Sequence, residues 1–391
     1  MKKLNKERLN RILSNRLEDD IRKAKTAGAE LYVSQYGETI CHITKGIKDV
    51  ETGEELQPNA MYRLASMTKP ITAVAALIAL DKGWISLDDE VREYLPDFSD
   101  MDVAVLKNGE IVVDHKAHTQ LKIYQMLSHC NGILAETEIG VAISETAKPS
   151  DYQTNETFLR YVSKQPLAFD PGECAAYTGR ASFDAIARII ELKSGMKYSD
   201  FLEEYVFDPL GIKDITYHPT QEQWERMVAV HDRSDFMNIV KVNLPDHTIY
   251  EGGPLTYEGA GSGLAGSLHD YAIFAEMLCN KGTYNGKELI KPELIEEMRK
   301  PRIPKDVFKY APNDSWIEGD NWGLGVRVKE QTSRLPKGAF GWSGAYGTHF
   351  WVDPENRITA VLMRNMRWFD TQGCGQMGVR FESDVMSCLE V

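Results

Sequence analysis

The first feature that could do chemistry is a serine followed three residues later by a lysine, Ser66 and Lys69. Three residues make about one helical turn, so the two side chains face the same way if a helix begins here. Burial would disfavour the charged amine and lower the pKa of Lys69. A neutral or hydrogen-bonded amine is what activates a serine hydroxyl. The spacing therefore predicts a nucleophilic Ser66 with Lys69 as its activating partner.

This S-x-x-K pattern fixes only two positions, and the chain contains it a second time at Ser194 and Lys197. There Gly195 directly follows the serine at the end of a helical run, which is typical of a helix exit. For Ser66 the alternative is a serine that only caps a helix N-terminus. The residues that follow each copy favour Ser66, because an apolar helix stands behind that copy alone.

That helix must position the pair. Residues 68–80 are apolar on nearly every side and stop at Gly83, which predicts a buried helix. Pro70 is compatible with its first turn. A helix N-terminus favours negative charge on the serine oxygen, and the N–H of Ser66 could donate to an oxyanion.

The strands that surround this helix are expected near both ends of the chain. Alternating patterns flank Gly37-Glu38 and predict a hairpin of residues 30–36 and 39–47, and an extended piece at 61–65 leads into Ser66. Further strands are expected at 322–328, 338–342, 349–352 and 358–363, with a turn at 353–356. Helices are expected at 4–17, 158–162, 183–192, 201–210, 268–278, 289–298 and 378–389.

This order of elements predicts an α/β (α+β) fold. Strands at both ends with helices between them indicate one antiparallel sheet built from both chain ends and flanked by helices. Residues 1–87 and 218–391 would form this sheet domain. Residues 88–217, where the signals are helical and loop-like, would form an inserted, mainly helical subdomain.

The amino-acid composition limits which binding partners are expected. The 391 residues carry 45 basic and 58 acidic side chains, a net charge of −13, which argues against nucleic acid or an anionic membrane as partner. No run reaches the roughly 18 apolar residues of a membrane span, and the N-terminal segment lacks a signal-peptide core. The six cysteines are scattered, so we expect reduced thiols and a cytoplasmic protein. The oligomeric state stays open.

Four segments carry a resemblance to a known family. They are YRLASMTKPITAVAALIALDKGWISLDDEVREYL at 62–95, LSHCNG at 127–132, PGECAAYTG at 171–179, and GWSG at 341–344 followed by Gly347-Thr348 and WVDPENRI. Together they resemble class C β-lactamases, D-alanyl-D-alanine peptidases and their family VIII carboxylesterase relatives. The segments occur in that family's order and cover most of the chain.

The resemblance implies a role for each matching residue. Ser66 would be the acylated nucleophile, Lys69 its hydrogen-bonding neighbour and possible base, and Tyr177 the proton shuttle between serine and leaving group. The oxyanion hole would consist of the N–H groups of Ser66 and Ala345. Without the resemblance, a core tyrosine with a bonded hydroxyl would be the favoured interpretation of Tyr177.

Two departures from the family's pattern bear on the substrate. Gly179 stands where peptidases and β-lactamases have an asparagine that orients an acylamino group, and Trp342 stands where they have a lysine. The W-x-G sequence is similar to the carboxylesterase branch, and both changes favour uncharged esters. Substrate-binding residues implied by the resemblance are Gly179, Trp342, Ser343, Gly344 and Asn365.

The expected function is therefore hydrolysis of a small-molecule carboxylic ester through an acyl-enzyme, without a cofactor. Two alternatives on the same site act on amides, namely a D-amino-acid peptidase or amidase and a true β-lactamase. A third alternative on the same site is an acyltransferase. A non-catalytic binding protein with the same fold is a further alternative.

Other patterns predict no chemistry. The glycine-rich run at 261–266 fits a dinucleotide fingerprint, but no clear strand leads into it, so it is expected to let backbone pass close to the active-site cleft. His115 and His118 lie in a polar turn without an evident third ligand, which predicts a solvated loop and no metal. His129 is expected to bond backbone beside the site. No G-x-S-x-G segment supports a Ser-His-Asp hydrolase.

Overall fold

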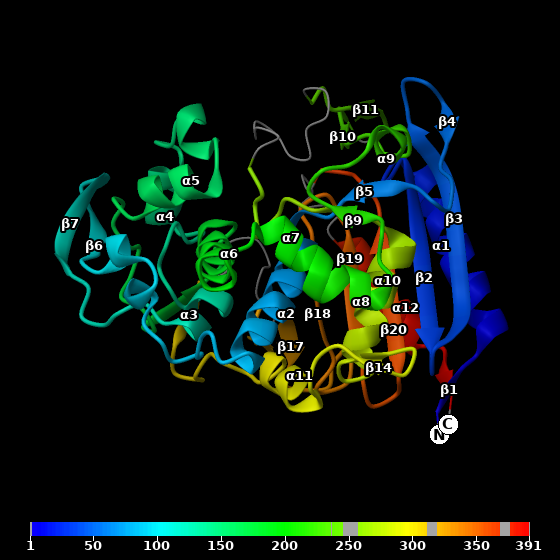
Figure 1. The fold of residues 1–391 in the computed structure, drawn as a ribbon. Helices are drawn as coiled ribbons and strands as arrows, with labels where there is room; N and C mark the ends of the chain where they lie inside the picture. Colours follow the sequence, from blue (N-terminus) through cyan, green and yellow to red (C-terminus); the bar gives the residue numbers. More distant parts are fainter. Residues whose placement is uncertain (1, 236, 245–256, 311–318, 368–375, 391) are drawn as a thin grey trace.

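The protein is built around one eight-stranded antiparallel sheet (Figure 1). This computed structural model describes residues 2–235, 237–244, 257–310, 319–367 and 376–390. The strands lie in the order β16-β17-β18-β19-β20-β2-β3-β4. In that order their bounds are Asp320–Trp322, Arg327–Lys329, Phe340–Ser343, His349–Asp353, Ile358–Met363, Gly28–Gln35, Glu38–Asp49 and Glu54–Glu55. Strands from both chain ends thus share one sheet, which confirms the expected architecture.

The seam between the two chain ends lies at β20 and β2. Leu31 pairs with Leu362 and Val33 with Ala360 in antiparallel register. Every residue of β20 is buried, because helices cover the sheet on both faces. A strand covered on both faces has no polar side to alternate with, so it forms a continuous apolar run.

Three helices cover the two faces of the sheet. α10 (Leu268–Cys279) packs against β19 and β20 on one face, while α1 (Lys6–Arg22) and α12 (Gln376–Met386) lie on the other. α1 buries Leu9, Leu13 and Leu17, spaced four residues apart along one stripe, as the predicted amphipathic helix requires. The two termini meet at the edge of Figure 1, where β1 (Lys3–Leu4) pairs with β21 (Leu389–Glu390).

α2 (Thr68–Asp81) is the buried helix that the sequence predicts. A short 3-10 turn, Ala65–Met67, precedes it, and every α2 residue from Thr68 to Ala79 is buried. It lies beside the sheet and contacts α6 (Ala181–Ser194) of the helical region. Its N-terminus follows β5 (Met61–Arg63), which forms a small sheet with β12 (Ala265–Ser267) and β9 (Ile215–Thr216).

The middle of the chain is mainly helical. Besides α6 it contains α3 (Ile123–Leu127), α4 (Glu138–Ser144), α5 (Asn155–Val162), α7 (Tyr198–Leu202) and α8 (Asp208–Leu210), with a π-helical turn at Glu203–Phe207. The division into domains at residues 87/88 and 217/218 stays a prediction. Further short elements are β8 (Cys174–Ala176), α9 (Gln221–Glu225), β10 (His231–Arg233), β11 (Ile239–Lys241), β13 (Thr283–Tyr284), β14 (Lys287–Glu288) and β15 (Phe308–Tyr310).

A hairpin in this middle region departs from the prediction of helices and loops. β6 (Asp102–Lys107) and β7 (Glu110–Lys116) pair around Asn108-Gly109, at the outer edge of the helical region in Figure 1. Both turn residues have positive φ, 56° and 82°. Asn-Gly is the dipeptide that favours such a hairpin turn, so a sequence signal for it existed and was missed.

Two further boundaries differ from those predicted. The single strand expected at 322–328 is wrong: β16 ends at Trp322 and β17 begins at Arg327. Between them Gly325 has φ 68°, and its N–H donates to the carbonyl of Leu127, so the chain turns here. The helix expected at 289–298 is α11 (Pro292–Met298), which begins at a proline because its fixed φ suits the first helical position.

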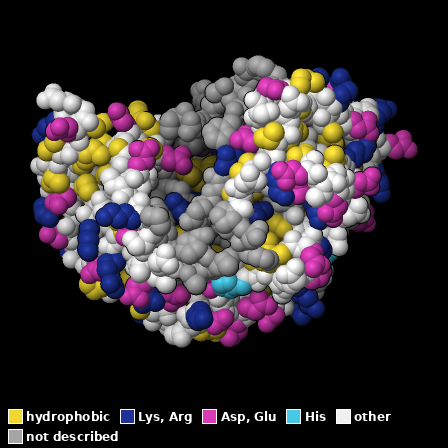
Figure 2. All heavy atoms as spheres, turned by 90° about the horizontal axis from the view of Figure 1, so that it is seen from above, with side chains coloured by type: hydrophobic (Ala, Val, Ile, Leu, Met, Phe, Trp, Pro, Cys, Tyr) yellow, Lys and Arg dark blue, Asp and Glu magenta, His cyan; other side chains and the backbone are white. Residues whose placement is uncertain are grey.

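The surface and the thiols agree with the composition. Figure 2 shows Lys and Arg side chains interspersed with Asp and Glu over the described part of one face, without a block of one sign. No described helix is long and apolar enough to cross a membrane. The described cysteines are free thiols, namely Cys41, Cys130, Cys174, Cys279 and Cys388, while Cys374 lies outside the described residues.

Candidate active site

Ser66 lies in the turn that opens α2, and the backbone before it is strained. Ala65 has φ +47°, in the left-handed region that a non-glycine residue rarely adopts. Such a conformation costs on the order of 1–3 kcal/mol and is typical of functional sites. Ala65 and Met67 are buried, whereas Ser66 between them is partly exposed. The turn therefore presents the serine to solvent at the edge of a packed core.

Lys69 lies one turn further along α2 and points at the serine. Its Nζ is 3.2 Å from Ser66 Oγ, 2.6 Å from the carbonyl oxygen of Gly179 and 2.9 Å from that of Gly261. The side chain is fully buried. Burial lowers the pKa of Lys69 to about 7, although the nearby Glu136 and Asp184 carboxylates oppose the shift.

These three contacts define what Lys69 can do in each protonation state. A charged amine has three protons and can donate to all three oxygens. A neutral amine has two protons and one lone pair, so with the two carbonyls as acceptors its lone pair is left for the Ser66 hydroxyl. With a pKa near 7 the neutral form is well populated at neutral pH, and Lys69 has the geometry of a base toward Ser66.

Tyr177 approaches Ser66 from the helical region. It follows β8, and its hydroxyl donates to Ser66 Oγ at 2.6 Å. Burial raises the pKa of Tyr177, so at neutral pH it is a phenol that donates a proton. The indole N–H of Trp342 lies 3.4 Å from the Tyr177 hydroxyl, and the two ring centroids are 5.4 Å apart.

His129 supports Tyr177 from behind. Its Nδ1 accepts the backbone N–H of Thr178 at 3.0 Å, and its ring lies 4.6 Å from the Tyr177 ring. The expectation that His129 bonds backbone beside the site is confirmed. Burial also lowers its pKa well below the usual value, which leaves the imidazole neutral.

The end of strand β18 is held against the turn that carries Ser66. The hydroxyl of Thr348 donates to the carbonyl of Leu64 at 3.0 Å. A Cβ on Gly344 would collide with both of these groups, so only glycine fits. Ala345, the expected second oxyanion donor, is the next residue and is exposed. Its role and that of the Ser66 N–H stay predictions.

The other expected substrate-binding residues lie in different surroundings. A Cβ on Gly179 would have no atom within 4 Å, so there is space beside the Lys69 contact. Ser343 Oγ is 2.8 Å from Nδ1 of His349. The Asn365 amide is bound to backbone, accepting from the N–H of Arg63 at 3.0 Å and donating to its carbonyl at 3.2 Å. These bonds tie Asn365 to strand β5, and its contact with substrate stays a prediction.

Sequence reasoning missed the groups that surround Lys69. The carbonyls of Gly179 and Gly261 hold its amine, and the buried Asp184 holds the second of these by accepting the N–H of Ala260 at 2.7 Å. Glu136 is close enough to affect the pKa of Lys69 and that of Tyr177. The one signal available was the glycine-rich run at 261–266, whose expected close passage of backbone is confirmed.

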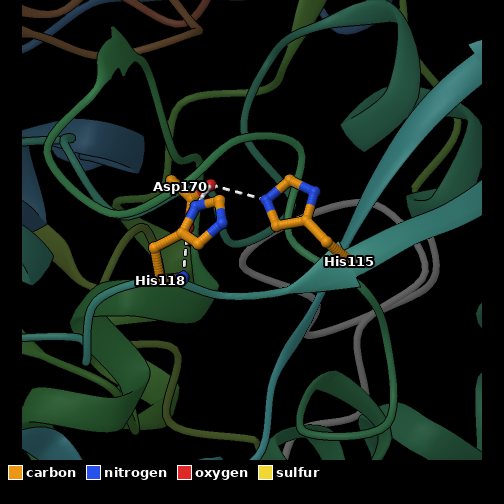
Figure 3. Close-up of side chains that lie close together, drawn as sticks. All are labelled: His115, His118 and Asp170. Atoms are coloured by element: carbon orange, nitrogen blue, oxygen red, sulfur yellow. Dashed lines mark hydrogen bonds and ion pairs between the residues drawn. The ribbon is translucent and has the colours of Figure 1, made fainter.

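One expectation about metal ligands was wrong. His115 and His118 do have a possible third ligand in the described chain, because the Asp170 carboxylate lies against both rings (Figure 3). Asp170 is 52 residues from His118 in sequence, so only the fold reveals it. The second S-x-x-K, by contrast, is the helix exit that the sequence predicts, since Gly195 ends α6 with φ 75°.

Known proteins share this fold and sequence pattern. Protein Rv1367c of Mycobacterium tuberculosis is 25% identical over 330 residues, 81% of this chain and 80% of that protein. Esterase EstB of Burkholderia gladioli is 24% identical over 380 residues, 90% and 89% of the two chains. The solved structure of EstCE1, described as a hydrolase with promiscuous acyltransferase activity, matches with a TM-score of 0.78 at 20% identity over 97% and 99% of the chains. A family model named Beta-lactamase matches residues 10–367, nearly the whole chain, and this protein therefore belongs to the beta-lactamase family of hydrolases.

Proposed function

We propose that the protein hydrolyses uncharged carboxylic esters through an acyl-enzyme on Ser66. One observation carries the proposal: Ser66 Oγ lies within hydrogen-bonding distance of both the Lys69 amine and the Tyr177 hydroxyl. A base and an acid on either side of one hydroxyl are what nucleophilic catalysis needs. The similarity to an esterase over 90% of the chain supports the same reaction class.

Acylation begins at the serine. Neutral Lys69 takes the proton of Ser66 as Oγ attacks the ester carbonyl carbon. The carbonyl oxygen becomes an oxyanion, for which the N–H groups of Ser66 and Ala345 are the donors we propose. When the tetrahedral intermediate collapses, Tyr177 donates its proton to the leaving alkoxide, and the proton held by Lys69 then restores the phenol.

Deacylation repeats these transfers with water as the nucleophile. Lys69, neutral again, takes a proton from the attacking water, and the second tetrahedral intermediate expels Ser66. The serine oxygen recovers its proton from Tyr177, which Lys69 restores. The sum is one ester and one water converted into one carboxylic acid and one alcohol, with all three side chains returned to their starting states.

Two residues favour esters over amides. Trp342 is only 7% exposed and contacts the Tyr177 hydroxyl, so the side chain at this position supplies no cation of the kind implied by the lysine of class C β-lactamases and peptidases, which would stabilise a phenolate or attract a carboxylate. Gly179 supplies no side-chain amide to hold an acylamino group. An amide nitrogen must be protonated as it leaves, whereas an alkoxide can leave without strong protonation. Cleavage of an amide therefore requires the scissile group to be held more accurately than cleavage of an ester does. Each lost polar contact corresponds to about 1–3 kcal/mol, or roughly ten- to hundredfold in rate.

Steady-state kinetics test this proposal. We expect kcat/KM for short-chain aryl esters to exceed that for a chromogenic cephalosporin and for D-alanyl peptides by roughly hundredfold or more. This total corresponds to a factor of about ten or more for each of the two lost contacts. Gly179→Asn fits the open space at that position and should narrow the ratio, and Trp342→Lys combined with it should narrow the ratio further. A wild-type protein that hydrolyses a cephalosporin with greater kcat/KM than any simple ester would contradict the ester assignment.

Transfer of the acyl group to an alcohol is a second activity that the same intermediate allows. The described activity of EstCE1, which shares this fold, favours it. Added alcohol would compete with water for the acyl-enzyme, so product analysis with increasing methanol should show methyl ester formed at the expense of acid. Acid as the sole product at every alcohol concentration would exclude transfer.

A further inference from the structure

Three side chains converge at a place that the proposed reaction does not use (Figure 3). His115 lies near the end of β7, His118 lies two residues beyond that strand, and Asp170 comes from the loop before β8. One possible ligand atom of each lies within 4.8 Å of the other two. Oδ2 of Asp170 is 2.7 Å from Nε2 of His115 and 3.0 Å from Nδ1 of His118.

The carboxylate of this cluster is held in place by the fold itself. Asp170 is only 3% exposed, and its second oxygen, Oδ1, accepts the backbone N–H of His118 at 2.6 Å. The next residue along, Thr119, donates from its hydroxyl to the carbonyl of Pro171 at 3.0 Å. The two segments are therefore joined by hydrogen bonds between side chain and backbone, and these bonds bring the ligand atoms together.

The donor atoms and their spacing fit one borderline divalent cation. Two imidazole nitrogens and one carboxylate oxygen are a set that zinc takes with a water as fourth ligand. Tetrahedral zinc places donor atoms about 3.3 Å apart, given bonds of about 2.0–2.1 Å. The two imidazole–carboxylate pairs would open by roughly 0.3–0.6 Å and the imidazole pair would close by at most about 1.5 Å, relative to that geometry. The His118 side chain is 68% exposed, so water can reach a fourth position.

A second carboxylate orients one of the rings. Nδ1 of His115 lies 3.1 Å from Oδ2 of Asp114, which leaves Nε2 of the same ring facing Asp170. Histidines that bind a metal characteristically donate their other ring N–H to a carboxylate or carbonyl. Asp114 thus supplies the outer contact that such a site requires, from the neighbouring position on β7.

We propose that His115, His118 and Asp170 bind one zinc ion. The ion would join the end of the β6–β7 hairpin to the loop that continues through Pro171 and β8 to Tyr177, seven residues after Asp170. In the described chain, none of the three ligands hydrogen-bonds to Ser66, Lys69 or Tyr177. Zinc at this place stabilises the folded protein and takes no part in ester hydrolysis.

Calorimetric titration of the full chain, freed of metal with EDTA and dialysed, tests the site. We expect one zinc ion per chain and a higher melting temperature with zinc, because binding to the folded state alone stabilises it. Mg²⁺, which prefers oxygen ligands, should produce neither effect. His115→Ala and His118→Ala should each lower the zinc affinity at least about tenfold, whereas His269→Ala, an exposed histidine on α10, should leave it unchanged.

Asp114→Asn keeps all three ligands and guards against loss of folding in the histidine variants. It should lower the zinc affinity by roughly tenfold or more through the orientation of His115. Co²⁺ in place of zinc should give visible absorption in the wild type and lose it in His118→Ala. Absence of stoichiometric zinc binding in the wild type, or a zinc affinity in both histidine variants that equals that of the wild type, would overturn the proposal.

Discussion

At the scale of single residues, the proposed mechanism makes the protonation state of Lys69 decide when Ser66 can react. Only the neutral amine can accept the serine proton, and burial lowers the pKa of Lys69 to about 7. Below that pH Lys69 is charged and cannot act as a base, and above it the neutral form prevails. We therefore expect kcat/KM for a neutral aryl ester to rise with pH through an apparent pKa near 7 and to level off above it. A profile that is flat or falls between pH 5.5 and 8.5 would contradict Lys69 as the base.

Glu136 tunes the same titration from nearby. Its carboxylate raises the pKa of Lys69, and it also raises that of Tyr177, in both cases by favouring positive over negative charge close by. Glu136→Gln removes this charge, so the rising limb of the pH profile should move to lower pH. Glu138→Gln, an exposed neighbour on α4, is the matched control and should leave the limb in place. A limb that moves to higher pH in Glu136→Gln would show that this electrostatic assignment is wrong.

At the scale of elements, the contact between β18 and the Ser66 turn should be intolerant of added volume. Gly344→Ala pushes a Cβ into the hydroxyl of Thr348 and the carbonyl of Leu64, so we expect a loss of about 1–3 kcal/mol in the free energy of unfolding. We also expect kcat to fall, because the same contact positions the turn that carries Ser66. Gly179→Ala is the matched control, because its Cβ would enter open space. Denaturant unfolding of the two variants measures the loss of stability, with Gly179→Ala as its control, and kinetics of Gly344→Ala against the wild type measure the loss of kcat. Equal stability of the two would contradict the tight contact.

The elements that the sequence predicts well are those with a single strong local signal. α2 was expected at 68–80 and spans Thr68–Asp81, because its apolar residues leave no other way to be buried and Gly83 ends the pattern. The β6–β7 hairpin was missed because β7 is largely exposed and its alternation is weak, so that only Asn108-Gly109 marked it. The division of 322–328 into two strands depends on Gly325, whose turn is fixed by a distant carbonyl of Leu127.

In the candidate active site, too, the sequence reveals some of the groups and leaves others unseen. Ser66 and Lys69 were found from their residue types and spacing and Tyr177 from the resemblance of its segment to a known family, and the structure brings the three together. The carbonyls of Gly179 and Gly261 that hold Lys69 are backbone atoms, which every residue has, so no pattern distinguishes them. Asp170 was missed beside His115 and His118 for a related reason, since contacts between distant segments exist only in the folded chain.

At the scale of the whole molecule, the proposed site depends on three separate parts of the chain. Ser66 and Lys69 come from the start of α2, Tyr177 from the helical region and Trp342 from the C-terminal part of the sheet. The proposed reaction uses no metal, because in it the side chains supply the nucleophile, the base and the acid.

Removal of metal by a chelator therefore distinguishes the role of the proposed zinc site from that of the proposed active site. EDTA should leave kcat/KM for an aryl ester unchanged at a temperature well below unfolding, even where it removes zinc from His115 and His118. The measurement is the initial rate before and after dialysis against EDTA, with zinc added back as control. A loss of rate that zinc restores would show that the metal takes part in hydrolysis.

The most direct test of the central claim is the position of the covalent intermediate. A serine-directed fluorophosphonate, followed by proteolysis and mass spectrometry, should add its mass to the peptide that contains Ser66. Ser66→Ala should lose both the label and turnover, the latter by roughly 10⁴–10⁶-fold, while Ser194→Ala should keep both. Labelling at Ser194 or elsewhere, with Ser66→Ala still hydrolysing esters, would contradict the account.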